Sequence, residues 1–223
     1  LEYKVDGFLI PRPLINRIIF ARSRFVNNTV LIWKDERFQK FLFNYYLWSG
    51  DIKCLEEPIK LMISFFTFSS DNPLPFTHVN LESFAQTAIN DKGSQICIAS
   101  ETSAEKLRTS YACNDIMIFG GENVEASTFV VKTDNETKLL EQFERWNIET
   151  ISNWSNYQKI AIHITATDSK EPKNGENLFN KVFDDVKLIT RYLSGNATSS
   201  VLSPRDGLQR GSIYAIIGFA NKL

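Results

Sequence analysis

The sequence contains few of the residues that usually bind metal ions. Its 223 residues include two histidines and three cysteines. The histidines, His78 and His163, lie far apart in the chain, and no Cys-x-x-Cys or His-x-x-x-His pair occurs. A zinc site needs about four converging nitrogen, sulfur or oxygen ligands, and these usually come in closely spaced pairs. We therefore predict no metal site.

The chain also lacks the glycine-rich turns that bind phosphate groups. None of its ten glycines belongs to a Walker sequence, and the expected strand-to-helix turn at Ser100-Glu101-Thr102 contains no glycine. Gly120 and Gly121 follow an expected strand but lead directly to Glu122, whose carboxylate would repel a phosphate. The usual nucleotide-binding motifs are therefore absent, and we predict no cofactor.

Cysteine number, apolar run length and net charge restrict the location of the protein. The three cysteines are odd in number and widely spaced, which argues against a disulfide framework. No apolar run approaches the roughly 20 residues that a membrane span needs. The formal net charge is -1, so no overall field draws the protein to a membrane or to nucleic acid. We expect an intracellular protein, cytoplasmic or nuclear, without membrane contact.

Apolar residues, in contrast, are abundant. The chain is 43% hydrophobic and 13% aromatic, and it contains 17 phenylalanines. This composition can fill a core and argues against disorder. The length lies at the upper end for one domain, so we predict a single globular domain over residues 1–223. Any hinge or sub-boundary is expected at 69–76, the clearest loop in the sequence.

Hydrophobic periodicity predicts alternating strands and helices. Strands are expected at 2–10, 30–33, 61–68, 95–99, 115–119, 128–132, 159–167 and 212–219, and helices at 13–25, 36–48, 81–89, 102–110, 135–146 and 176–193. Residues 194–211 are rich in Ser, Gly and Pro and contain no expected element. We predict an α/β or α+β fold with one mixed, mostly parallel sheet that is flanked by helices on both faces.

Residues 95–119 form the clearest local unit of this prediction. Thr102-Ser103-Ala104-Glu105 has the pattern of a capping box, in which a hydroxyl and a carboxylate satisfy each other's backbone amides at a helix start. Apolar segments at 95–99 and 115–119 flank that helix. The pattern predicts a compact parallel βαβ crossover.

Candidate catalytic residues are scarce. His163, His78 and Cys113 are the candidates, because nucleophilic catalysis needs a nucleophile such as Cys within hydrogen-bond reach of a base such as His. Sequence alone does not show that reach. A histidine inside an alternating strand, like His163, is more often a core or cross-strand group than a catalytic one.

Positive charge gathers at both ends of the chain. Residues 1–40 carry eight Lys or Arg against four Asp or Glu, and residues 191–223 carry four against one. Basic side chains beside aromatic rings can bind an anionic partner such as nucleic acid. The candidate binding residues are therefore Arg17, Arg22, Arg24, Trp33, Arg205 and Arg210. A solvated charged surface, or docking of the ends on the acidic middle, is the alternative reading.

Two functional hypotheses follow from these observations. The first is a non-catalytic interaction domain, or a subunit of a larger assembly, that binds a protein or an anionic partner through its basic ends. The second is an enzyme acting on a phosphodiester or nucleotide, with a site assembled from distant residues that include His163. A deep pocket that gathers His163, a cysteine or several acids would favour the enzyme. A broad exposed patch of Phe, Tyr and Trp, or a contiguous Arg surface, would favour the interaction domain.

Overall fold

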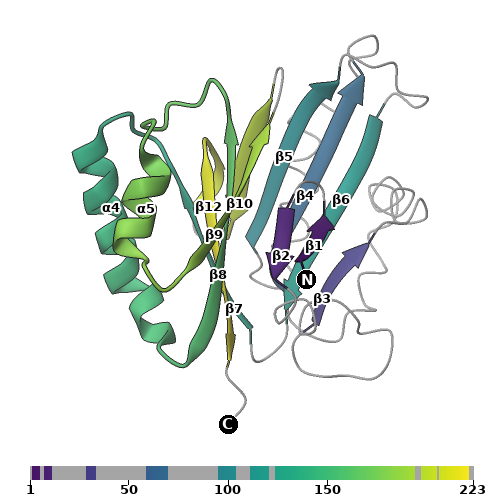
Figure 1. Cartoon of the computed structure of the whole chain (residues 1–223). Coiled ribbons are helices and arrows are strands. Elements are labelled where there is room, and N and C mark those ends of the chain that lie inside the picture. The colour runs from purple at the N-terminus through teal and green to yellow at the C-terminus, as the bar shows by residue number, and fades with distance from the viewer. Residues whose placement is uncertain are drawn as a thin grey trace.

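The computed structural model of the chain describes residues 2–5, 8–11, 29–33, 59–69, 95–103, 111–120, 124–193, 197–204 and 206–220. Strands predominate in these ranges (Figure 1). The strands are β1 (Glu2–Val5), β2 (Phe8–Pro11), β3 (Thr29–Trp33), β4 (Ile59–Ser69), β5 (Gln95–Ser103), β6 (Tyr111–Gly120), β7 (Val124–Val130), β8 (Tyr157–Ala166), β9 (Lys187–Leu193), β10 (Thr198–Ser203), β11 (Gly207–Arg210) and β12 (Ile213–Ala220). The helices are α4 (Glu136–Glu149), α5 (Gly175–Val182) and the 3-10 helix η2 (Ile151–Trp154).

The strands form a hairpin and two larger sheets. β1 and β2 make the antiparallel hairpin. A six-stranded sheet has the order β11-β10-β5-β4-β6-β3, and a four-stranded sheet has the order β7-β12-β8-β9. The parallel pairs are β4 with β5 and β8 with β9, and the other pairs of these sheets are antiparallel. Both sheets are therefore mixed and mainly antiparallel.

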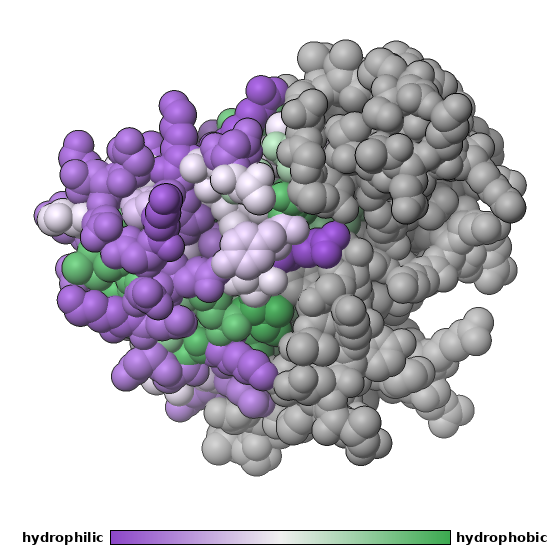
Figure 2. Space-filling view, turned by 45° about the horizontal axis from the view of Figure 1, so that its top comes forward, coloured by the Kyte–Doolittle hydropathy of each residue, from purple (hydrophilic) through white to green (hydrophobic). Residues whose placement is uncertain are grey.

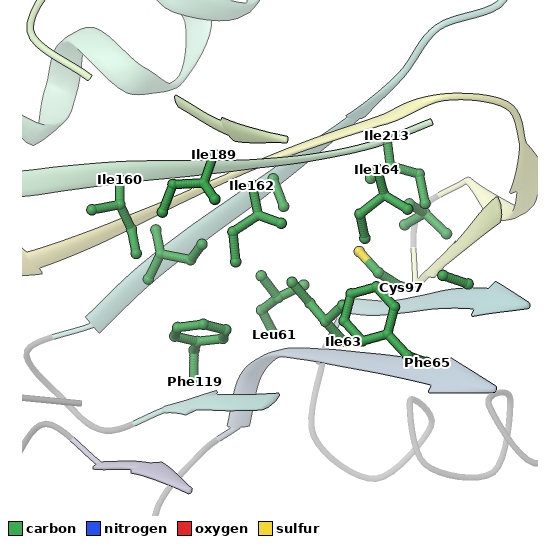
Figure 3. Close-up of a cluster of buried hydrophobic side chains, with 14 of the residues drawn as sticks. Leu61, Ile63, Phe65, Cys97, Phe119, Ile160, Ile162, Ile164, Ile189 and Ile213 are labelled. Atoms are coloured by element: carbon green, nitrogen blue, oxygen red, sulfur yellow. The ribbon is translucent and has the colours of Figure 1, made fainter. Parts of the chain in front are cut away.

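The two sheets pack face to face over one hydrophobic core. Figure 3 shows isoleucines of the four-stranded sheet facing side chains of the six-stranded sheet. Ile160, Ile162 and Ile164 point into this core from β8, because alternate residues of a strand share one face. The opposing side chains include Leu61, Ile63, Phe65, Cys97 and Phe119.

A second core lies between the four-stranded sheet and the helices. Leu139, Phe143 and Trp146 of α4 are buried at three- and four-residue spacing, which places them on one helical face. They pack with Phe179 of α5 and with Tyr214 and Ile216 of β12. The four-stranded sheet is thus the middle layer of a sheet–sheet–helix arrangement (Figure 1).

The predicted fold class is wrong. In place of one mostly parallel sheet with helices on both faces, the chain forms two mixed sheets, and strands outnumber helices in the described residues. The reason lies in strands such as β12, which is buried along both faces. Such strands are typical of parallel sheets covered by helices. Here the second sheet provides one of the two covers.

The predicted βαβ unit at 95–119 is also wrong. Thr102 and Ser103 continue β5 instead of opening a helix, consistent with the strand preference of Thr. β4 lies between β5 and β6, and it runs parallel to the first and antiparallel to the second. β5 and β6 are therefore neither adjacent nor parallel.

A parallel βαβ crossover does exist, later in the chain. β8 leads through α5 to β9, and β8 and β9 pair in parallel. The predicted helix at 176–193 ends at Val182, and its second half forms β9. Residues 194–211, for which no element was predicted, contribute β10 and β11.

Several expectations lie outside the described residues. These are the helices at 13–25, 36–48 and 81–89, and the hinge at 69–76 beyond Ser69. Within the part of the chain that the structure describes, no helix is long and apolar enough to cross a bilayer. The prediction of a single domain stays a prediction.

Candidate functional site

Three ionisable side chains of the β8–α5 crossover converge at the helix-facing side of the four-stranded sheet. His163 lies in β8, opposite Tyr214 of β12. Glu171 belongs to the connection after β8, and Glu176 to the first turn of α5. The carboxyl end of a parallel strand and the following helix start commonly form functional sites in α/β units. We call these three residues and their hydrogen-bond partners the His163 cluster.

Both nitrogens of the His163 imidazole face carboxylates. Nε2 lies 2.9 Å from Oε2 of Glu171, and Nδ1 lies 3.5 Å from Oε1 of Glu176. Oγ1 of Thr190 is 3.4 Å from Nδ1. The side chain of His163 is 2% exposed. This arrangement fits a doubly protonated imidazolium that donates to an acceptor on each side.

Glu171 accepts hydrogen bonds from the sheet. Its carboxylate bonds to His163, to the hydroxyl of Tyr214 through Oε1, and to the side chain of Ser212. The hydroxyl of Ser212 also lies 2.7 Å from Oγ1 of Thr165. Although the Glu171 side chain is 6% exposed, its charge is therefore compensated by a cation and two hydroxyl donors.

Aromatic rings enclose the imidazole. The rings of His163 and Tyr214 are stacked, with centroids 4.0 Å apart and planes at 9°. Tyr214 stacks in turn on Phe179 of α5, at 4.9 Å and 13°. A cationic imidazolium gains from a π-face at such a distance, particularly where water is absent.

The pKa of His163 reflects two opposing effects. Burial alone lowers the pKa, because it disfavours the charged imidazolium. The hydrogen bonds and charges of Glu171 and Glu176 outweigh burial and raise the pKa of His163 above its ordinary value of 6.5. The two carboxylates thus favour the imidazolium form of His163.

The carboxyl groups shift in the opposite direction. Burial tends to raise the pKa of Glu171, but the contacts with His163, Tyr214 and Ser212 prevail and lower it. The hydrogen bond from His163, aided by Tyr192 and Thr190, lowers the pKa of Glu176 to about 2. Both carboxylates remain ionised at neutral pH, and the cluster carries a formal charge of -1 when His163 is in its imidazolium form.

Two tyrosines complete the cluster. The hydroxyl of Tyr192 donates to Oε1 of Glu176 at 2.5 Å, and this bond is the main cause that raises the pKa of Tyr192 to about 12. Burial and the charge of Glu171 raise the pKa of Tyr214. Tyr192 is 60% exposed and the Glu176 side chain 38%, so these two residues form the outer end of the cluster.

This chemistry is poorly suited to acid–base catalysis near neutral pH. A catalytic acid or base works best when its pKa lies near the working pH. The solvent-accessible groups of the cluster have pKa values of about 2 and about 12. His163, whose ordinary pKa is the nearest to neutrality, has a carboxylate at each nitrogen and no lone pair for a substrate proton.

The cluster does not form a metal site. Glu171 and Glu176 lie against opposite nitrogens of one ring, so their oxygen atoms diverge around the imidazole. Among the described residues, no group of three or more His, Cys, Asp or Glu side chains is placed to hold a metal ion.

The catalytic candidates from the sequence are not brought together where the structure describes them. Cys113 lies in β6 of the six-stranded sheet, opposite Phe66 of β4. His163 lies in the other sheet, and its ring stacks within the helix-facing core. His78 is outside the described residues. Cys97, which is flanked by Ile96 and Ile98 in the sequence, is 0% exposed in the core between the sheets.

The binding candidates occupy separate places. Trp33 lies in β3 and the exposed Arg210 in β11, and these strands are opposite edges of the six-stranded sheet. Arg17, Arg22, Arg24 and Arg205 are outside the described residues. The structure therefore describes the positions of two candidates from the basic ends, five strand spacings apart.

Sequence reasoning missed the partners of His163. Tyr214 becomes its neighbour through the antiparallel register of β8 and β12, which a single sequence does not specify. Glu171 and Glu176 lie in and after a polar connection, where acids are common. One signal was available: a buried histidine in a strand requires a polar partner, and the next acids along the chain follow that strand.

The sequence matches no protein-family model and no curated protein.

Proposed function

We propose that this chain is a non-catalytic domain that binds a macromolecular partner, a protein or an anionic molecule, through its basic terminal segments. The observation that supports it best is the state of His163, the strongest catalytic candidate. Its ring is buried and each of its nitrogens faces a carboxylate. Such an ionic cluster fixes the shape of a fold more readily than it turns over a substrate.

The surface supports binding in a second way. Arg210 is exposed on β11, and β3, which follows the basic N-terminal segment, is at the opposite edge of the sheet. Five strand spacings amount to about 24 Å. A partner that contacts both Trp33 of β3 and Arg210 of β11 is therefore extended over about this width. We place this function inside the cell, where the buried Cys97 thiol stays reduced.

The proposal is tested by charge reversal in the full chain. One variant changes Arg17, Arg22, Arg24 and Arg210 to Glu. A matched control changes Lys132, Lys138, Lys170 and Lys181 to Glu. These lysines are exposed around the helix layer, where hydrophilic residues predominate on the face seen in Figure 2. Both variants alter the formal charge equally, so a difference between them reports position and not net charge.

A labelled single-stranded DNA serves as the anionic probe, with binding measured between 50 and about 200 mM salt. We expect the arginine variant to lose most of its affinity, and its log-log salt slope to fall by about 3 if all four arginines contact phosphates. The control should bind like the wild type. Equal loss in both variants would contradict binding through the basic ends. If the wild type itself does not bind DNA, the same pair is compared in cross-linked pull-downs for a protein partner.

The enzyme hypothesis makes a separate prediction. A phosphodiesterase that uses His163 would hydrolyse bis(p-nitrophenyl) phosphate and would lose this activity in a folded His163→Gln variant. We expect no such activity in either protein. Turnover that depends on His163 would overturn the non-catalytic proposal.

A further inference from the structure

The connection between β8 and α5 covers the His163 cluster. We call residues 167–174 the strap. Asp168, Lys170 and Lys173 in it are exposed, whereas Pro172 is buried. Its described backbone hydrogen bonds are local, from Ser169 N to Ala166 O, from Gly175 N to Pro172 O and from Leu178 N to Asn174 O. The strap is therefore joined to the sheet mainly through side chains.

Glu171 provides the most extensive of these side-chain attachments. It bonds to His163 of β8, to Tyr214 of β12 and to Ser212 beside β12. Ser169 adds a bond of 3.1 Å with the Thr165 hydroxyl. All these partners belong to the sheet or its immediate extension, and none belongs to the strap.

The three donors lie in the four-stranded sheet or directly beside it. His163, Ser212 and Tyr214 are each at most 2% exposed. Tyr214 is stacked between His163 and Phe179, which restricts its ring. Donors whose side chains are held by packing form a preorganised site. Here they converge on one carboxylate.

Space for that carboxylate also comes from the fold. Gly175 lies against Glu171, and a Cβ atom at this position would collide with Oε1. The absent side chain leaves room for a carboxyl group between the helix start and the sheet. α5 itself stays attached through Phe179 and Phe183, which are buried in the second core. These core contacts of α5 do not involve the strap.

We propose that His163, Ser212 and Tyr214, together with the space beside Gly175, form a carboxylate-binding site, which the strap occupies with its own Glu171. The strap is then a latch, and a carboxylate of another molecule displaces it. This inference goes beyond the proposed function, since it concerns a different surface from the basic ends.

The tether explains why the site is closed in the free protein. A carboxylate on a short connection has an effective concentration on the order of millimolar or higher, so a dilute free carboxylate competes poorly. Removal of the tethered group exposes the site to a probe. The three donors would then be buried without their acceptor, which is costly and favours uptake of an anion.

The test uses Glu171→Ala in the full chain, with sodium formate as the probe. We expect the variant to melt below the wild type. Formate should then raise its melting temperature by about 2–4 °C in a saturable manner, above the effect of sodium chloride at equal ionic strength. Glu141→Ala, at an exposed position of α4, is the matched control. The control and the wild type should respond to formate as they do to chloride.

A comparison of probes identifies the source of the carboxylate. A third probe is N-acetylglutamic acid α-amide, which keeps only the side-chain carboxylate of glutamate. If formate and acetate stabilise Glu171→Ala but this blocked glutamate does not, the site takes small carboxylic acids. If the blocked glutamate also stabilises the variant, the site takes acidic side chains of a partner protein. No saturable response to any of the three, or an equal response in the control, would overturn the proposal.

Two further measurements test the proposal if Glu171→Ala does not fold. In that case, formate should restore the far-ultraviolet circular dichroism of Glu171→Ala, whereas chloride should not. In the wild type, concentrated acetate should accelerate amide exchange in residues 167–174 relative to chloride, and exchange in β8 and β12 should stay unchanged. Equal exchange in both salts would contradict a displaceable latch.

Discussion

His163 and Tyr214 face each other across β8 and β12, and their rings are stacked 4.0 Å apart. The Tyr214 ring helps to shield the imidazole of His163 from solvent, where the four-stranded sheet meets the core beneath the helices. The imidazolium depends on two carboxylates for its neutralisation, and each carboxylate depends on it. Removal of one charged group leaves a buried partner without its counter-charge. The free energy of unfolding should therefore fall by more than the net contribution of the intact ion pair.

The first prediction concerns His163→Gln. This change removes the cation and leaves the buried Glu171 without its charge partner. We expect the free energy of unfolding to fall by about 3–5 kcal/mol. Urea denaturation followed by tryptophan fluorescence measures it.

Glu125→Gln is the control for that change. Glu125 lies 3.6 Å from Nζ of Lys60, and the two side chains are 36% and 34% exposed. Ion pairs with such access to solvent contribute about 1 kcal/mol or less, so this variant should remain close to the wild type. An equal cost for both variants would show that burial of the His163 cluster adds nothing.

The second prediction concerns Gly175→Ala. The new methyl group should displace the Glu171 carboxylate from its donors. We expect a destabilisation similar to that of Glu171→Ala. The double variant should be about as stable as the single variants, because both changes remove the same interaction. Gly207→Ala is the control: its φ is +65° and its Cβ would meet no atom within 4 Å, so it should cost only about 1–2 kcal/mol of backbone strain. Additive losses in the double variant would refute this account.

Some of this structure could be predicted from the sequence. The strands around Leu61, Ile162 and Ile216 were located correctly, because continuous apolar or alternating segments have few other solutions. The helix predicted at 135–146 was also located. It runs from Glu136 to Glu149 as α4, and its N-cap is Asn135, whose Oδ1 accepts from Lys138 N at 2.9 Å.

The errors have a physical cause. Ile189 and Leu193 are four positions apart, a spacing that places residues on one face of a helix and equally on one face of a strand. The amphipathic pattern that begins in α5 therefore continues into β9 without a visible break. β10 was missed because it contains Ser199 and Ser200, which are buried polar residues in a segment typical of loops. The cluster around His163 depends on the pairing of β8 with β12 and with β9, which the sequence alone does not reveal.

The third prediction concerns Cys97. Its side chain lies in the core between the sheets, and burial raises the pKa of the thiol. Since the thiolate is the reactive form, alkylation needs opening of the sheets. We expect iodoacetamide to label Cys97 at least about 100-fold more slowly in the native protein than in urea, measured by peptide mass spectrometry. Fast native labelling at this position would contradict the packing of the two sheets.

The last prediction concerns pH. The pKa values of Glu171 and Glu176 are lower in the folded protein than their ordinary value of 4.5. Their contribution to stability is therefore fully present above 4.5 and is lost as pH falls towards the folded values. The pKa of His163 is higher than its ordinary 6.5, so its contribution is fully present below 6.5 and is lost as pH rises through the folded value.

The free energy of unfolding should consequently reach a plateau between pH 4.5 and 6.5 and decline on both sides. Glu176→Gln should make the acid decline shallower, because one shifted carboxyl group no longer titrates. It should also move the alkaline decline to lower pH, because His163 keeps only Glu171 as a charged partner. Urea titrations at a series of pH values measure both shifts. Glu141→Gln, on the exposed side of α4, should keep the wild-type profile. If the Glu176 and Glu141 variants give the same profile, the charges around His163 do not control the pH dependence of folding.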